Sequence, residues 1–154
     1  MMTKWRQKFF DKAINLYAPY LGAGVRMKVM SEDHRYIRVE MPLTILNKNY
    51  VGTQFGGSLY SMVDPWYMLM LIKNLGPDYI VWDKAATINF RKPGEGKVIA
   101  EFNLSQEVID EVRATCAAQT KMDKIFRVEI KDESGKLIAD VDKVLYIRLK
   151  QPLP

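Results

Sequence analysis

Residues 49–75 begin with Asn49-Tyr-Val-Gly52-Thr-Gln-Phe55-Gly56-Gly57-Ser-Leu-Tyr-Ser-Met-Val-Asp64 and continue with Pro65-Trp-Tyr-Met-Leu-Met-Leu-Ile-Lys-Asn-Leu75. This stretch predicts a glycine-bearing loop that leads into one long apolar helix, which ends at Gly76 and Pro77. Within the helix the only acid is Asp64 and the only base is Lys73. A helix that is apolar on every side must be enclosed by the rest of the domain. The fold therefore has to be built around this helix.

The same stretch also indicates a functional site. Glycines at a helix start leave backbone N–H groups free to meet a ligand, with the positive end of the helix dipole behind them. A single carboxylate about two turns into an apolar helix is costly to bury unless it has a role. Gly56, Gly57 and Asp64 are therefore the first candidate site residues.

The composition is that of an ordinary globular protein. The chain has 154 residues, of which 48% are hydrophobic and 27% charged, so we expect a single domain over residues 1–154. No apolar run is long enough to span a membrane, and residues 1–8 lack the apolar core of a signal peptide. The single cysteine, Cys116, excludes an internal disulfide. We therefore expect a cytoplasmic protein.

The formal net charge of +5 is compatible with a nucleic acid, an anionic membrane or a phosphorylated ligand as partner, and equally with a solvated basic surface. The basic residues are scattered through predicted strands and turns and do not cluster on one helix. We therefore expect no nucleic-acid partner.

Hydrophobic periodicity predicts the remaining elements. Residues 1–20 have the pattern of an amphipathic lead-in helix closed by Pro19, and residues 150–154 form a tail. Ser105 is expected to cap a helix over residues 106–120. Strands are expected at residues 25–29, 37–41, 82–91, 97–104, 126–130 and 136–149. In the last of these, every odd-numbered residue from 137 to 149 is apolar except Lys143.

Strands that are joined by hairpins form an antiparallel sheet, and a sheet curled around the apolar helix satisfies both elements. The predicted fold class is therefore α+β, with an antiparallel sheet wrapped around a long central helix. Because such a sheet has free strand edges, we also expect the chain to form oligomers.

This arrangement resembles the hotdog fold, and the motif resembles that of acyl-CoA thioesterases of the phenylacetyl-CoA thioesterase and human thioesterase-superfamily type. Their signature is an Asn, a Gly, a His-Gly-Gly and an Asp nine residues after that His. Asn49, Gly52, Phe55-Gly56-Gly57 and Asp64 keep every interval. The added helix at residues 106–120 is more like an uncharacterised bacterial branch of the superfamily. The resemblance spans about residues 20–149.

Phe55 departs from this signature, because these thioesterases have His at its position. The difference puts the placement of the substrate in doubt. It also argues against a hotdog dehydratase, which needs a His paired with an acid. The only histidine of the chain, His34, falls in a predicted surface turn.

The resemblance implies a thioesterase that hydrolyses acyl-CoA or a related acyl thioester, with coenzyme A as part of the substrate and no metal or other cofactor. Asp64 would activate the water or act as a nucleophile. The N–H groups of Gly56 and Gly57 would face the thioester carbonyl, and Asn49 would hold the water or the substrate amide. In this family the carboxylate and the glycine loop come from opposite subunits, which implies a homodimer or a dimer of dimers.

Four further residues are candidates for substrate binding, namely Phe55, Asp83, Arg91 and Lys92. Asp83 stands where related enzymes have a small polar residue that helps the site. Arg91 and Lys92 could meet the phosphates of coenzyme A.

Each candidate also has a purely structural interpretation. Asp64 could cap a second helix that starts at Pro65, or be a buried structural acid. The two glycines could only allow close packing of helix and sheet, and Asn49 could only form a turn. Asp83 could pair with Lys84, and the two basic residues could form a solvated hairpin end. For the molecule as a whole, the alternative to an enzyme is a non-catalytic protein that binds an acyl or lipid ligand.

Overall fold

The computed structural model describes residues 13–150 and contains within them a six-stranded sheet in the order β1-β2-β4-β5-β6-β3. Neighbouring strands are antiparallel throughout. The strands are β1 (Arg26–Met30), β2 (Tyr36–Met41), β3 (Tyr79–Phe90), β4 (Val98–Asn103), β5 (Lys121–Asp132) and β6 (Leu137–Leu149). The helical segments are η1 (Ile14–Leu16), α2 (Ala18–Ala23), α3 (Gly56–Val63), α4 (Trp66–Leu75) and α5 (Gln106–Gln119). The predicted α+β class is confirmed.

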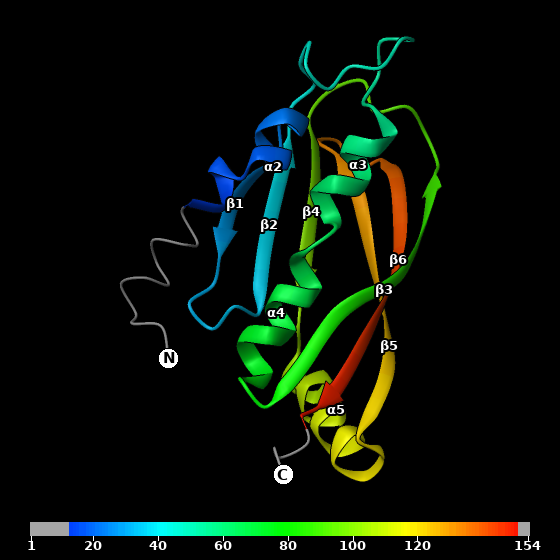
Figure 1. The fold of residues 1–154 in the computed structure, drawn as a ribbon. Helices are drawn as coiled ribbons and strands as arrows, with labels where there is room; N and C mark the ends of the chain where they lie inside the picture. The colour runs from blue at the N-terminus through cyan, green and yellow to red at the C-terminus, as the bar shows by residue number, and fades with distance from the viewer. Residues whose placement is uncertain (1–12, 151–154) are drawn as a thin grey trace.

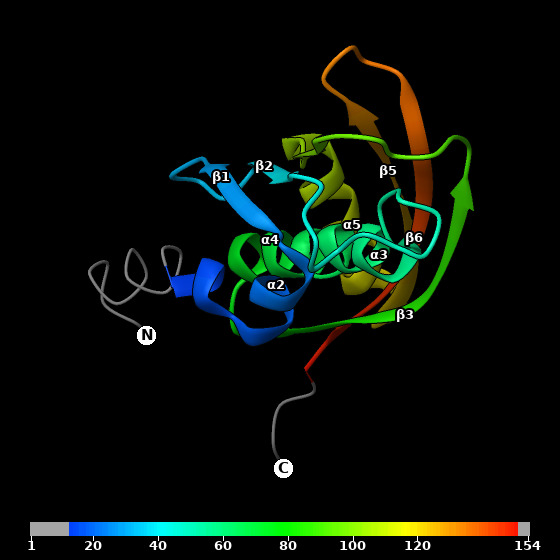
Figure 2. The same cartoon turned by 90° about the horizontal axis from the view of Figure 1, so that it is seen from above.

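The sheet curls around α3 and α4, which follow one another along its inner side (Figure 1). Seen from above, the two helices lie in a trough bounded by β2, β6 and β3 (Figure 2). Met62, Trp66 and Met70 of these helices have no exposed surface, and neither do Val39 of β2 and Val141 of β6. The apolar helix is thus enclosed, as its composition requires.

The central helix is interrupted, so the prediction of one continuous helix is wrong. Asp64 and Pro65 separate α3 from α4, although both keep a right-handed helical backbone. Proline causes the break because it has no N–H group to continue the hydrogen-bond ladder. At the break, the indole Nε1–H of Trp66 donates to the carbonyl of Met62 at 2.8 Å. The Asp64 side chain does not cap α4, so the interpretation of Asp64 as a helix cap is also wrong.

The lead-in helix predicted for residues 1–20 lies largely outside the described residues, as does the tail at residues 151–154. In the part that is described, Pro19 stands in the first turn of α2. Proline fits there because the N–H groups of the first turn have no partner within the helix. Pro19 therefore opens α2, while its predicted role, with Gly22 and Gly24, in closing the lead-in helix stays a prediction because that helix lies largely outside the described residues. Gly24, with a φ of 76°, ends α2.

α5 separates β4 from β5 at one end of the sheet. These strands share only three residue pairs, from Val98 with Asp132 to Ala100 with Ile130. Beyond them α5 covers the widening gap with its buried side chains Ile109, Val112 and Cys116. The predicted cap is confirmed, because the Ser105 hydroxyl accepts the N–H of Val108. No helix within residues 13–150 has the length and apolarity needed to cross a membrane.

Trp66 links the helix break to the core, so its replacement tests that role. Trp66→Phe is expected to lower the free energy of unfolding by about 2–4 kcal/mol, since it leaves a cavity and deprives the Met62 carbonyl of its donor. Trp82→Phe is the matched control, because Trp82 is 47% exposed and its loss should cost within about 1 kcal/mol. Chemical denaturation measures both, and equal losses would contradict the role of Trp66.

Candidate functional site

Two buried amide side chains hold the loop that precedes α3. The Asn47 carbonyl oxygen accepts the N–H of Thr44, and its amide donates to the carbonyls of Ala23 and Pro42 at 2.9 and 2.8 Å. Gln54 donates to the carbonyls of Met41 and Gly96. Because both side chains are almost fully buried, these bonds fasten the loop to the body of the domain. Neither residue was predicted from the sequence to belong to the site.

Asn49 is folded into its own turn. Its side-chain oxygen accepts the N–H groups of Val51 and Thr53, at 3.1 and 3.0 Å. Its amide donates to the hydroxyl of Thr53 at 2.9 Å. These contacts support the turn-forming interpretation of Asn49, while its predicted role in holding water or substrate stays a prediction.

Gly56 and Gly57 begin α3, and neither of their N–H groups donates to any residue among those described. Both glycines also make room for aromatic rings. A Cβ atom on Gly56 would lie 2.9 Å from Cζ of Phe90, and one on Gly57 would lie 2.5 Å from Cε1 of Phe55. The glycines therefore serve close packing, and they leave two donors at the positive end of a helix dipole.

A groove of about 430 Å³ lies beside the start of α3. Its lining residues come from the loop, α3 and the end of β3: Asn49, Thr53, Gln54, Gly56, Leu59, Phe90, Arg91, Lys92, Pro93 and Gly94. Four of the predicted site residues, Asn49, Gly56, Arg91 and Lys92, are thus brought together.

The side chain of Arg91 forms an ion pair with Asp140. Its guanidinium contacts Asp140 of β6 through Nε at 2.5 Å and Nη2 at 3.3 Å. Asp140 has no exposed side-chain surface and is also bound by Arg127 and Asn89. The hydrogen bond from Arg91 is the largest cause that lowers the pKa of Asp140, so the pair stays charged. Lys92 has no ion-pair partner within the described part of the chain, and it is the freer of the two cations predicted to meet phosphate.

Asp64 does not line this groove. Its Oδ1 atom lies 2.8 Å from Nζ of Lys143 on β6, and its side chain is 45% exposed. Lys143 has only 1% of its side chain exposed. The interpretation of Asp64 as a fully buried structural acid is therefore wrong, since a buried cation holds one side of it and solvent reaches the other.

Asp83 and Tyr60 complete the cluster around Lys143. Asp83 Oδ1 lies 2.9 Å from Nζ as an ion pair whose angles are not those of a hydrogen bond. The Tyr60 hydroxyl accepts from Nζ at 3.1 Å. The predicted pairing of Asp83 with Lys84 is wrong, because Lys84 pairs with Asp123.

A bulge brings Asp83 to the inner face of the sheet. Asp83 lies opposite Leu145, and the next pair is Ala85 with Val144, so Lys84 is an extra residue in β3. Partners in an antiparallel pair share a face, and an extra residue reverses the alternation of side chains. Asp83 therefore shares the inner face with Ala86, which lies opposite Lys143.

The charges in this cluster depend on one another. Burial is the largest influence on Lys143 and lowers its pKa, but Asp64, Asp83 and Tyr60 together raise that pKa above its ordinary value. Burial raises the pKa of Asp83, and Asp64 raises it further, while Lys143 acts in the opposite direction. Lys143 is therefore an ammonium group at neutral pH.

The groove and the Lys143 cluster are separate in one protomer. Gly56 and Asp64 are the two ends of one helix, and eight residues at 1.5 Å rise place them about 12 Å apart along its axis. A carboxylate must come within hydrogen-bond reach of the water that it activates. The carboxylate and the free N–H groups of one chain therefore cannot act on the same carbonyl.

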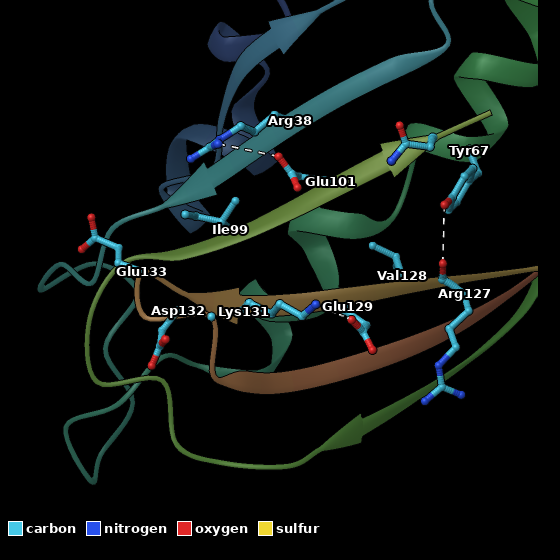
Figure 3. A pocket seen from close by; sticks show the side chains of 12 residues that line it. Arg38, Tyr67, Ile99, Glu101, Arg127, Val128, Glu129, Lys131, Asp132 and Glu133 are labelled. Atoms are coloured by element: carbon cyan, nitrogen blue, oxygen red, sulfur yellow. Dashed lines mark hydrogen bonds and ion pairs between the residues drawn. The ribbon is translucent and has the colours of Figure 1, made fainter. Parts of the chain in front are cut away.

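A second cavity, of about 550 Å³, lies where β4 and β5 diverge (Figure 3). At its inner end the hydroxyl of Tyr67 donates to the carbonyl of Arg127 at 3.4 Å. Its charged side chains are largely paired with one another, as in Lys131 with Glu129 and Arg38 with Glu101. None of the predicted site residues lines it. Among residues 13–150, no three His, Cys, Asp or Glu side chains are grouped so that they could hold a metal ion.

Comparison with known proteins identifies the fold. A family model described as a domain of unknown function, DUF4442, matches residues 6–147. No curated protein is significantly similar in sequence.

Solved structures share the arrangement along most of the chain. PA5026 of Pseudomonas aeruginosa, described as a protein of unknown function and a probable thioesterase, is 21% identical with a TM-score of 0.79, over 92% of this chain and 95% of that one. The thioesterase HI1161 of Haemophilus influenzae is 16% identical with a TM-score of 0.66, over 92% and 90%. The PaaI protein from the phenylacetic acid degradation operon of E. coli is 20% identical with a TM-score of 0.63, over 96% and 98%. The chain thus has the hotdog fold that was predicted, and it shares this fold with PA5026, HI1161 and PaaI.

Gly94 tests how tightly the loop is held. A Cβ atom there would lie 2.9 Å from Cγ of the buried Gln54, whereas none of the neighbouring atoms lies within 4 Å of a Cβ on Gly96. Gly94→Ala should therefore lower the free energy of unfolding by about 1–3 kcal/mol through overpacking. Gly96→Ala, in the same turn, is the control and should leave it nearly unchanged. Equal effects in chemical denaturation would show that Gln54 does not hold the loop.

Proposed function

Because this chain belongs to the DUF4442 family and has the fold of thioesterase-superfamily proteins, we propose that it is a cytoplasmic hydrolase of acyl-CoA or a related acyl thioester. The observation that most supports the proposal is the position of Asp64 between α3 and α4. This carboxylate interrupts an apolar helix, one of its oxygens is held by a buried lysine, and nearly half of its side chain is open to solvent. A carboxylate in this setting can bind and deprotonate a water molecule.

The proposed reaction needs a base and a place for negative charge. Asp64 takes a proton from water, and the water oxygen attacks the carbonyl carbon of the thioester. The carbonyl oxygen becomes an oxyanion, which the N–H groups of Gly56 and Gly57 stabilise. The tetrahedral intermediate then collapses, the carbon–sulfur bond breaks, and the thiol of coenzyme A leaves with the proton that Asp64 returns. Asn49 keeps the glycine loop in shape, and Lys92 supplies positive charge for the phosphates of coenzyme A.

We further propose that two copies of the chain build each site, in a homodimer or a dimer of dimers. The base of one protomer would then meet the glycine loop of its partner, which removes the separation of about 12 Å within one chain. Exposed apolar side chains near both parts support an interface: Tyr50, Val51 and Phe55 on the loop, and Trp82 and Phe90 on β3. β3 is also an edge of the sheet, and an open edge can pair with a second copy.

One observation favours a second function, that of an acyl or lipid binder without catalysis. The ring of Phe55 lies against Gly57, beside the N–H group that is proposed to meet the oxyanion. If this ring denies the carbonyl access, the groove binds its ligand without hydrolysis. Native mass spectrometry that retains an acyl ligand, together with no turnover across acyl chain lengths, would establish this function.

Asp64→Asn is expected to lower kcat about 10²–10⁴-fold, because the amide cannot accept the proton of the attacking water. The fold should be kept, since the amide oxygen can still accept from Lys143. Release of free thiol from a panel of acyl-CoA substrates measures the effect, and circular dichroism checks the fold. Asp78→Asn, an exposed acid in a turn, is the control and should leave kcat unchanged. Full activity in Asp64→Asn would remove Asp64 from the mechanism.

The shared site makes a separate prediction. Gly57→Val and Asp64→Asn proteins should each be nearly inactive, but hybrids formed after mixed refolding contain one site in which both parts are intact. A statistical mixture of a C2 dimer should then recover about a quarter of the wild-type activity. No recovery, despite hybrids seen by mass spectrometry, would place the whole site in one chain.

A further inference from the structure

Lys143 is the buried cation at the centre of the cluster, and none of the signature residues of the resemblance corresponds to it. We propose that Lys143 is a positioning residue for the hydrolysis, which holds one oxygen of Asp64 so that the other faces the water, while Asp83 holds Lys143 in place from β3. This inference rests on the proposed function, because it concerns the same base.

Oxygen atoms surround the ammonium group of Lys143. Nζ has three oxygen neighbours, at 2.8 Å on Asp64, 2.9 Å on Asp83 and 3.1 Å on Tyr60. Asp64 and Tyr60 accept hydrogen bonds from it, and Asp83 forms an ion pair with it. These neighbours come from three elements, since Tyr60 is on α3, Asp83 is on β3 and Asp64 is at the helix break. An ammonium bound from three sides cannot turn towards substrate, and with 1% of the side chain exposed it cannot touch substrate. Its effect has to pass through Asp64.

The second oxygen of Asp64 is the one left for chemistry. Only Oδ1 of this carboxylate bonds to another side chain within the described part of the chain. Because 45% of the side chain is exposed, water can reach the carboxylate, and Lys143 leaves Oδ2 free to meet it. An anchored carboxylate presents this oxygen in one orientation, which is what a general base requires.

Asp83 holds the ammonium group from a second element. Its Oδ1 atom lies 2.9 Å from Nζ, so the buried charge of Lys143 faces one acid on β3 and another at the helix break. These contacts fix the position of Nζ, and Nζ in turn fixes one oxygen of Asp64.

Two tyrosines also interact with Asp64. Tyr20 of α2 has a buried hydroxyl with no hydrogen-bond partner among the described residues, and its pKa is raised first by burial and then by Asp64. Burial is also the main cause that raises the pKa of Tyr60. Both hydroxyls therefore stay neutral at physiological pH, and the positive charge that faces Asp64 comes from Lys143.

Separate measurement of kcat and KM tests the inference, because a residue that orients the base acts on turnover and not on substrate binding. Lys143→Met frees the Asp64 carboxylate and should lower kcat about 10–100-fold with KM nearly unchanged. Lys143→Arg keeps the positive charge and the donors, and should restore part of kcat. A residue that only supports the fold would lower the free energy of unfolding without this selective loss of kcat.

Lys84→Met is the matched control, because Lys84 is also a lysine paired with an aspartate but has 53% of its side chain exposed. Its kcat and KM should match those of the wild type. If Lys143→Met does not fold, Asp83→Asn still tests the proposal, since it removes the charge that holds Nζ from β3 while keeping nearly the same side-chain shape, and it should also lower kcat with KM nearly unchanged. An unchanged kcat in the folded variants, with thioester hydrolysis by the wild type intact, would overturn the role of Lys143 alone.

A structural measurement separates this inference from the proposed function. Crystal structures of the wild type and Lys143→Met show whether the Asp64 carboxylate keeps its orientation without the lysine, and we expect it to turn away or to become disordered. An unchanged orientation in Lys143→Met would overturn the positioning role, whatever the activity. Absence of hydrolysis by the wild type on every thioester would overturn the proposed function and the catalytic part of this inference.

Discussion

Enclosure of an apolar helix is the constraint on which the rest of this structure depends. The side chains of α3 and α4 are mostly apolar and cannot face water, so the sheet has to curl around these helices (Figures 1 and 2). A break in such a helix would normally leave backbone groups unpaired in the core, at a cost of about 1–3 kcal/mol each. Trp66 lowers this cost, because its ring fills the core while its indole N–H serves the carbonyl of Met62. The helix can therefore be interrupted at Asp64 and Pro65, where the Asp64 side chain remains partly exposed to solvent.

The cluster of Lys143, Asp64, Asp83 and Tyr60 lies at this interruption of the helix. A buried ammonium is costly unless oxygen atoms replace its water, and the break at Pro65 lets Asp64 and Tyr60 face β6 from the end of α3. Asp83 reaches the same point only because Lys84 is a bulge residue. Three local departures from regular structure, namely a proline, a bulge and a charged residue in an apolar row, thus meet at one place. Such departures from local consistency concentrate at functional sites.

Hydrophobic alternation predicted the strands and the residue type of Ser105 predicted the cap, because each is a local property of the chain. One continuous helix was favoured over a second helix starting at Pro65, because apolar side chains keep one helical face on both sides of the proline. The partner of Asp83 was missed for a different reason, since a one-residue bulge reverses the alternation of a strand and leaves no mark in its composition. Lys143 could have been singled out from the sequence, because it is the one charged residue among the apolar odd-numbered residues of β6. A lysine in such a row needs acid partners, but which acids these are depends on tertiary contacts.

The two halves of the candidate site are held by unrelated sets of bonds. Buried amides of Asn47 and Gln54 fix the glycine loop to the body of the domain, whereas Asp64 is fixed from β6 through Lys143. Both halves are therefore rigid in one protomer, and a bend in α3 large enough to close about 12 Å would have to break one of these sets. Rigid halves that cannot meet within a chain can still meet across an interface without any conformational change. In such a site the reacting groups are already oriented in each folded protomer, so formation of the dimer requires little further ordering of side chains.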